Sequence, residues 1–593
     1  MINIEINNQL LDLYPNTEIN YYLTNPMFSD IGNFTLPLKI ANNKSNRIKL
    51  NFPGRISNIN NNIADYEASI QARSLKLRGL LSVKETSNEE FDAYYTDGIG
   101  EFNYLVENKY LTDISADDYE WDTKNEMDAY LRDTINHIYP DRDFVCFPVQ
   151  NINLFDGTSG EDEWKAHYNS INAWDWTTSN FRTAWQYHIP FFYISYIIEK
   201  LFNTFGYIMG RNPFRTIAEF RRLIVYFPCF RRINNISIWN EYYRQEDGKF
   251  KINLVNYTSK YPILDFIKGI ENAFCCKFFI NNTTKVVDIK FWKEILSSGD
   301  YEDITGKASE EFTVINDDEL NGYNLSYNFD SNDESTSLKD IDNYIRIDDV
   351  NSYDDLPSYS SEEDIDHIFE LCFVQNENSF YIYYKKTGES IYDWYKLSEH
   401  LYELKSGDGD FEIASEISPL RLMINEGSES VLMPFQELSA INEPDYPFED
   451  MDNIGFFPLS DDMYKVLNPR FLFYRGIFST LSQKQYPFAS NHVYYKNISG
   501  DHDYSKINNA NYALSWEGPY GLYESFWKEY LYWYINFRKP VKRYIHWKAE
   551  DIQNIDYSKK YRIGNHDYFI KSIPVKINTS GYMELEETEL IKV

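Results

Sequence analysis

The sequence predicts a β-rich α+β chain of several domains, made of several small sheets or barrels with a few amphipathic helices. Three observations predict this class. The chain has 593 residues, and one hydrophobic core rarely serves more than about 250–300. Short runs with a period of two, separated by turn residues, occur towards both ends. Amphipathic runs with helical spacing lie near 190–206 and 262–275.

The first 150 residues are predicted to form one β-rich domain. Ile2, Ile4 and Ile6 alternate with polar residues, as expected of a half-buried strand. Turn residues, mostly Pro, Asn and Gly, then separate further short apolar runs. From 72 to 106 the same pattern predicts a continuing series of short strands.

Residues 151–300 are predicted to form an α+β domain. Pro190 is expected in the first turn of a helix, and Gly206 in the left-handed position after its last turn. Pro262 is expected to open a second helix, which a hairpin of strands at 276–280 and 286–292 follows. A helix followed by a hairpin is an α+β unit.

Three further regions complete the predicted organisation. Residues 301–420 form an acidic, insertion-rich region, 421–520 a mixed connecting domain, and 521–593 a helix followed by a small β-domain. Residues 301–370 hold 21 Asp or Glu and three Lys or Arg, a net charge of −18. We expect a solvated, loop-rich insertion there, with a patch facing a partner or a channel as the alternative.

The charge of the whole chain excludes one class of function. The formal net charge is −34, from 91 Asp plus Glu and 57 Lys plus Arg. A negatively charged surface repels the phosphate backbone, so we do not expect the protein to bind DNA. A protein indifferent to DNA and a conduit through which DNA slides both fit this charge. Because 17% of the residues are aromatic, we expect a folded chain.

The cysteines and the hydropathy pattern indicate folding in a reducing cytoplasm. The five cysteines include no CxxC, so neither a disulfide framework nor a zinc site is expected. No secretory signal precedes the first strand, and no run approaches the roughly 18 apolar residues of a membrane span. The cysteines are Cys146, Cys229, Cys275, Cys276 and Cys372.

Motifs for catalysis are missing, so we expect no enzyme, no catalytic residue and no cofactor. There is no P-loop, dinucleotide fingerprint, HExxH or GxSxG. Asp408, Asp410 and Glu412 resemble the first half of a calcium loop and are weak candidates for a metal site. The distal Glu and the sharp-turn Gly of such a loop are missing, which favours a hairpin turn at this position.

Two other kinds of cluster have a structural interpretation beside a functional one. Asp501-His502-Asp503 and Asn565-His566-Asp567 place His beside carboxylates, but in polar, turn-like settings that favour a solvated His. Acids lie beside tryptophans at 161–164 and 174–176, as in glycoside hydrolases. Since both residue types abound here, we expect Trp174 and Trp176 to belong to a core or an interface.

Segments near both ends and in the middle carry a resemblance to a known family. They are NQLLDLYPNT at 8–17, NPMFSDIG at 25–32, LPL at 36–38, GLYESFWK at 521–528, VKRYIHW at 541–547, DI at 551–552 and YFI at 568–570. They resemble tail structural proteins of phages that infect Bacteroidetes, including crAss-like phages. The middle segment, from LDFI at 264–267 to VDI at 287–289, resembles the helix-plus-hairpin element of tail-hub-like domains.

The resemblance implies a virion structural protein, made in the host cytoplasm and built into the tail. It implies a homo-oligomeric ring, a hub or a distal muzzle, around the channel through which double-stranded DNA is ejected without specific binding. Other tail proteins would be its partners, and no catalytic residues carry over. The alternative hypothesis is a tail protein that binds or degrades glycans with paired carboxylates and aromatic platforms.

Overall fold

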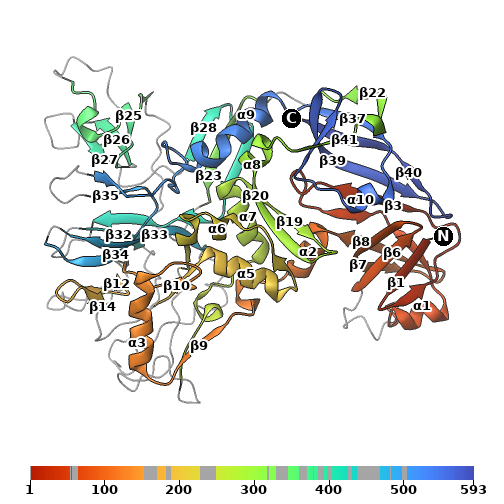
Figure 1. Cartoon of the computed structure of the whole chain (residues 1–593), viewed down its shortest axis with the longest axis horizontal. Coiled ribbons are helices and arrows are strands. Elements are labelled where there is room, and N and C mark those ends of the chain that lie inside the picture. Colours follow the sequence, from red (N-terminus) through yellow and green to blue (C-terminus); the bar gives the residue numbers. More distant parts are fainter. Residues whose placement is uncertain are drawn as a thin grey trace.

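The computed structural model is a β-rich α+β protein with many small sheets, which confirms the predicted fold class. Figure 1 shows a large sheet on the right, a central body of helices and short strands, and small sheets on the left. Structure is described for residues 2–53, 55, 65–151, 170–181, 189–227, 249–316, 320–328, 345–359, 370–377, 379–384, 393–396, 403–424, 431–436, 468–480, 482–496 and 504–593.

The largest sheet takes strands from both ends of the chain. Its order is β2-β1-β6-β7-β8-β4-β3-β39-β41-β37-β22, with β5, β21, β38 and β40 beside this path. The first strands are β1 (Ile2–Ile6), β2 (Gln9–Leu11), β3 (Ile19–Thr24), β4 (Asn33–Thr35), β5 (Leu38–Ala41), β6 (Asp65–Ala72), β7 (Leu75–Thr86) and β8 (Glu90–Asp97). The others are β21 (Tyr301–Asp303), β22 (Ala308–Val314), β37 (Pro540–Ile545), β38 (Lys560–Ile563), β39 (His566–Ile577), β40 (Met583–Leu585) and β41 (Glu587–Lys592).

Alternating side chains explain why the outer strands of this sheet form. Ile2, Ile4 and Ile6 are buried, as the period of two predicts, and the polar residues between them are half-buried. The same alternation runs through β3 and β6. These buried side chains share one core with C-terminal residues such as Ile573 and Val575.

The pairing of β3 with β39 joins the two ends of the chain. Six residue pairs run antiparallel, from Ile19 opposite Ile577 to Thr24 opposite Ser572. The sequence predicts 1–150 and 521–593 as separate domains, and the structure differs, because strands of both ranges pair in one sheet. Pairing between such distant segments depends on tertiary contacts that local periodicity does not encode.

Asn25 fixes this junction just beyond β3. Its side chain is fully buried and donates to the carbonyl oxygens of Ile570 at 2.7 Å and Tyr557 at 3.1 Å. Its Oδ1 accepts from the amide of Met27 at 2.9 Å. Phe28 then packs between the ring of Phe569 and two tryptophan rings of the central body. The segment 25–28 therefore holds the large sheet against that body.

A close backbone approach follows in the same loop. Gly32 has φ +76°, and a Cβ there would lie 2.2 Å from the amide nitrogen of Gly100. Gly100 belongs to α2 (Ile99–Val106), where the sequence predicts strands and the structure has a helix. The helix forms because Phe102 and Val106, four residues apart, both enter the central core.

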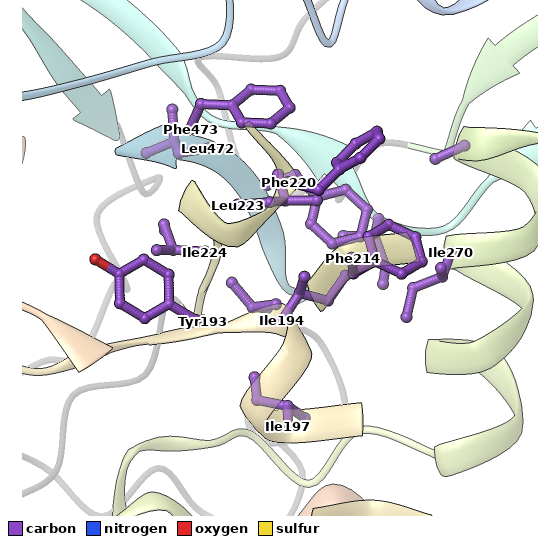
Figure 2. Close-up of a cluster of buried hydrophobic side chains, with 14 of the residues drawn as sticks. Tyr193, Ile194, Ile197, Phe214, Phe220, Leu223, Ile224, Ile270, Leu472 and Phe473 are labelled. Carbon is purple, nitrogen blue, oxygen red and sulfur yellow. The ribbon is translucent and has the colours of Figure 1, made fainter. Parts of the chain in front are cut away.

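The central body is built around a six-stranded sheet and helices that cover it. The strands are β10 (Phe144–Val145), β15 (Phe191–Tyr193), β17 (Leu223–Tyr226), β30 (Ser418–Pro419), β33 (Arg470–Ser479) and β34 (Gln485–Ser490). The helices are α5 (Ile194–Thr204), α6 (Pro213–Thr216), the 3-10 turn η4 (Phe220–Arg222) and α7 (Ile263–Phe274). Figure 2 shows their side chains converging, among them Ile197, Phe214, Phe220, Ile270 and Phe473.

The predicted helices of this body are present, with one boundary corrected. α5 begins at Ile194 and not at Pro190, because residues 191–193 are held extended as β15, between β10 and β17. Gly206 follows α5 with φ +80°, as predicted. α7 begins directly after Pro262 and leads into the hairpin β19 (Cys276–Asn281) and β20 (Val286–Phe291), which confirms the helix-plus-hairpin prediction.

The acidic stretch 301–370 does not form one unit. Residues 301–316 join the large sheet through β21 and β22. β23 (Gly322–Tyr327) lies between β28 (Glu403–Gly407) and β29 (Phe411–Ser415), which contact the central body. A third part enters the small sheet of β24 (Ile345–Arg346), β25 (Glu370–Val374), β26 (Ser379–Tyr384) and β27 (Asp393–Lys396). More than half of its acidic residues lie outside the described residues.

The C-terminal pattern is largely confirmed. A π-helical turn at Tyr523–Trp527 continues into α9 (Lys528–Asn536), the predicted helix, which ends before Pro540. The strands that follow are β37 to β41, and α10 (Ala549–Gln553) lies between β37 and β38. No helix in the described part of the chain combines the length and apolarity needed to cross a bilayer.

The remaining elements are short and complete the small sheets and connections. The helices are α1 (Lys44–Lys49), α3 (Lys124–Asp133) and α8 (Trp292–Ser297). The strands are β9 (Asp118–Trp121), β11 (Val149–Asn151), β12 (Ser170–Ile171), β13 (Trp174–Asp175), β14 (Asn180–Phe181), β16 (Ile208–Met209), β18 (Phe250–Asn253), β31 (Arg421–Ile424), β32 (Leu432–Gln436), β35 (Tyr494–Lys496) and β36 (Tyr504–Lys506).

Replacing Asn25 with Ala is expected to destabilise the junction by about 3 kcal/mol or more, because several buried backbone groups lose their partner. Urea unfolding followed by tryptophan fluorescence measures this effect. Asn103→Ala is the matched control, since Asn103 makes one exposed hydrogen bond to the carbonyl oxygen of Asp30. Equal unfolding midpoints for the two variants would contradict the role of Asn25.

Candidate functional site

The calcium candidates do not form a metal site in the structure. Asp408 and Asp410 lie in the connection between β28 and β29, and all three candidate carboxylates, with Glu412 on β29, are exposed. Asp410 Oδ2 accepts from the amide of Asn321 at 2.8 Å, which fixes the turn. Among the described residues no group of three His, Cys, Asp or Glu is placed to hold a metal ion.

The turn at Asp408 is not the hairpin that the sequence predicts. β28 and β29 lie on opposite sides of β23, antiparallel and parallel to it. The connection therefore passes over the start of β23, and Gly407 and Gly409 take φ values of +61° and +75° to make the bend. The Asp410 carboxylate stabilises this crossing connection through its hydrogen bond with the amide of Asn321.

The aromatic and histidine clusters are structural where they are described. The ring nitrogen of Trp174 donates to the carbonyl oxygen of Gln485 at 2.8 Å, and Trp176 packs on Tyr486, so both indoles belong to the core and its edge. Asp567 forms a bidentate pair with Arg562, which holds the pKa of Asp567 below its usual value. The clusters at 161–164 and 501–503 lie outside the described residues.

Among the described residues, the most deeply buried ion pair joins Glu219 to Arg475. Arg475 Nη1 lies 2.6 Å from Glu219 Oε1, and both side chains are almost fully buried. Arg475 also donates to the Ser490 hydroxyl and to the carbonyl oxygens of His492 and Tyr512. Burial lowers the pKa of the guanidinium, and the Glu219 carboxylate opposes that shift.

The carboxylate of Glu219 is equally occupied. It accepts from the amides of Asn511 at 2.8 Å and Tyr512 at 3.2 Å in addition to Arg475. Every contact ties η4 to β33, β34 or the loop near 511. The pair is therefore a structural lock that links η4 to β33 and to the loop near 511.

A second buried acid, Asp97, sits where β8 meets the central body. Tyr21 donates to its Oδ2 at 2.8 Å and Asn33 to its Oδ1 at 2.6 Å. Burial raises the pKa of Asp97, and these two hydrogen bonds oppose the rise. Glu101, one turn further, pairs with Lys285 at 3.1 Å and accepts from Asn282. Asp97 therefore links β8 to β3 and β4 within the large sheet, and Glu101 joins α2 to the turn of the hairpin that follows α7.

An open groove of about 480 Å³ lies between residues 112–118 and the segment 253–255, and its lining does not favour a glycan site. The lining contains two carboxylates, Asp113 and Asp118, with small and aliphatic neighbours and no aromatic ring. Sugar recognition relies on a stacking platform beside the paired acids. The other lining residues are Thr112, Ile114, Ser115, Ala116, Asn253 and Val255.

The surface feature that stands out is the free edge of the large sheet. We name Glu310, Glu311, Phe312 and Val314 of β22 the β22 edge. β22 pairs with β37 on one side, and no described strand pairs with its other side. Phe312 is 58% exposed and Val314 47% exposed, although Val314 lies opposite the buried Val541.

Sequence reasoning missed this edge as a specific surface. The only local signal in the sequence is the run Phe312-Thr313-Val314 inside an acidic stretch. This run predicts a strand, but it does not distinguish an exposed edge strand from a strand inside a sheet. An exposed edge strand with apolar side chains is a template for association with another chain. The β22 edge is therefore a candidate interface.

Comparison with known proteins adds no assignment. No protein-family model matches the chain, and a search of curated proteins gives no significant match.

Replacing Arg475 with Met is expected to lower the free energy of unfolding by about 3–5 kcal/mol, because Glu219 would remain buried without its counter-ion. Arg215→Met is the matched control, since Arg215 is half exposed in its pair with Glu199 and its loss is expected to cost about 1 kcal/mol or less. Urea unfolding of both variants measures the difference. Similar losses in the two variants would show that the buried pair is not a lock.

Proposed function

We propose that the chain is a structural subunit of a phage tail, several copies of which form a ring around the channel for DNA ejection. The observation that carries the proposal is the strong acid excess on a multi-sheet scaffold. In the described part of that scaffold the buried charges reported above are all used in structural contacts. The resemblance of the segments near both ends to tail proteins supports the same function.

The charge suits passage of DNA. In a ring, the acid excess of each copy is repeated around the inner wall, and the like charge of the phosphates prevents adhesion. A basic lining would instead release counter-ions from the DNA and hold it. We infer that the acidic residues serve as a wall that DNA passes.

The scaffold suits assembly. The described Cys146, Cys275, Cys276 and Cys372 are buried free thiols, so packing and strand pairing hold these parts of the chain together. The β22 edge leaves apolar side chains in water at the end of a large, rigid sheet. Such a patch is typical of a protein that associates with a partner.

Purified protein at micromolar concentration is expected to form a closed ring visible by negative-stain electron microscopy. Sedimentation velocity over a hundredfold range of concentration measures the same assembly in solution. The protein is also expected among the tail components when purified particles of the encoding phage are analysed by mass spectrometry. A monomer at every concentration, together with absence from particles, would refute the proposal.

The assembled protein is expected not to bind double-stranded DNA at about 50 mM salt, a condition in which basic proteins bind phosphates without regard to sequence. A gel-shift titration with a duplex of a few hundred base pairs measures this. A basic DNA-binding protein in the same gel is the positive control. Retardation that weakens as salt is raised would contradict an acidic channel wall.

A further inference from the structure

The large sheet ends in two surfaces of opposite charge. The β22 edge closes one end of the strand order, and β2, with α1 packed beside it, closes the other. Figure 1 shows β22 at the top and α1 at the bottom of the right-hand part of the molecule. The two surfaces therefore lie at opposite ends of one sheet.

The acids of the β22 edge are available for a partner. Within the described part of the chain, neither Glu310 nor Glu311 takes part in an ion pair. The nearest basic side chains on β37 are occupied. Arg543 donates to the carbonyl oxygen of Ser309 and lies across the ring of Phe312, and Lys542 pairs with Glu589 at 3.3 Å.

The opposite end is basic. Residues 31–64 contain five Lys or Arg and no Asp or Glu, in a chain where acids outnumber bases by 91 to 57. We name Leu10, Lys44, Arg47, Ile48 and Lys49 the α1 corner. Leu10 is 50% and Ile48 58% exposed, so this corner also combines uncovered apolar side chains with charge.

Two basic side chains of the α1 corner donate to neutral groups. Arg47 Nε donates to Asn42 Oδ1 at 2.6 Å, and Lys49 Nζ donates to the carbonyl oxygen of Leu10 at 2.5 Å. Among the described residues no ion pair involves Lys44, Arg47 or Lys49. Two exposed acids lie nearby: Asp12, whose Oδ2 accepts from Asn43, and Glu89, whose carbonyl oxygen accepts from the amide of Asn42 at 2.8 Å.

We propose that the β22 edge of one copy binds the α1 corner of the next copy, head to tail. Glu310 and Glu311 would face the cations of α1, while Phe312 and Val314 would cover Leu10 and Ile48. Since β2 is three residues long and Lys49 occupies the Leu10 carbonyl, the contact is made by side chains and not by extending the sheet.

The opposite charges determine the symmetry of this contact. Two copies of the β22 edge would place glutamates against glutamates, so a two-fold contact through it is disfavoured. A head-to-tail contact repeats, and it gives a ring when the rotation closes and a filament when it does not. The inference deepens the proposed ring and rests on it only in requiring several copies.

Edge-strand glutamates have another recognised role, which predicts the opposite behaviour. Charged residues on an edge often prevent association, in which case removing them increases it. If the β22 edge is instead an interface, Glu310→Ser with Glu311→Ser weakens self-association. The direction of this single change separates the two roles.

The sharper test is an exchange of charge. Reversing the edge in one variant (Glu310→Lys, Glu311→Lys) or the corner in another (Lys44→Glu, Arg47→Glu) is expected to weaken self-association at least tenfold by sedimentation velocity. An equimolar mixture of these variants, and a variant carrying all four changes, restores complementary ends. Both are expected to regain most of the wild-type association.

The matched control is a variant in which the charges of two exposed acidic residues of the central body are reversed, Glu107→Lys and Asp141→Lys. This variant is expected to associate as the wild type does. Circular dichroism and thermal unfolding establish that every variant is folded. A zero-length carbodiimide cross-linker, applied to mixed ¹⁴N and ¹⁵N protein, is expected to join Lys44 or Lys49 to Glu310 or Glu311 between copies.

The possible failures can be told apart. A wild-type protein that stays monomeric at all concentrations overturns the ring and this inference together. A wild-type oligomer that neither reversal weakens, or that only the edge reversal weakens, leaves the ring in place and overturns the head-to-tail contact. Failure of the mixture and of the fourfold variant to reassociate also overturns it.

Discussion

The antiparallel pairing of β3 with β39 is the constraint on which the rest of the structure depends. It makes one rigid sheet from two ends of a long chain, and Asn25 then fixes the position of that sheet against the central body. Phe28 lies at the same point, in contact with aromatic rings of both parts. Because the two ends of the chain pair in one sheet, the middle of the chain is an insertion between strands of that sheet. This middle part forms small sheets of its own.

In the described part of this very acidic chain, the buried charges reported above are held by ion pairs or hydrogen bonds. Glu219 and Arg475 satisfy each other and several backbone groups, and Asp97 is held by a tyrosine and an asparagine. Exposed charges in the described part of the chain, such as Glu310 and Glu311, are screened by water and salt. Aromatic packing also stabilises the core, as the edge-to-face contact of Phe220 with Phe274 and its tilted contact with Phe526 illustrate.

Local patterns predicted the elements whose formation depends on near neighbours. The alternation from Ile2 to Ile6, the helix that begins after Pro262 and the hairpin behind it follow from periodicity and turn residues alone. Helical spacing places residues 191–193 in the helix, and this prediction is wrong because their extended form comes from pairing with β10 and β17, which lie far away in sequence. The crossing at Asp408 was missed for the same reason, since the strand that separates β28 from β29 lies some eighty residues earlier. The β22 edge was not predictable, because exposure of an edge depends on which strand ends the sheet.

The charge distribution along the large sheet gives association a direction. Each copy carries a net charge of −34, so copies repel one another at long range, although screening confines that repulsion to roughly 8 Å at physiological ionic strength. Cohesion must then come from short-range contacts between surfaces that differ in sign. An acid-free segment of this length in so acidic a chain concentrates positive charge at the end of the sheet opposite to β22. Because rigid strand pairing fixes the angle between the two ends, the same scaffold that joins the termini would also set the curvature of any repeating assembly built on them.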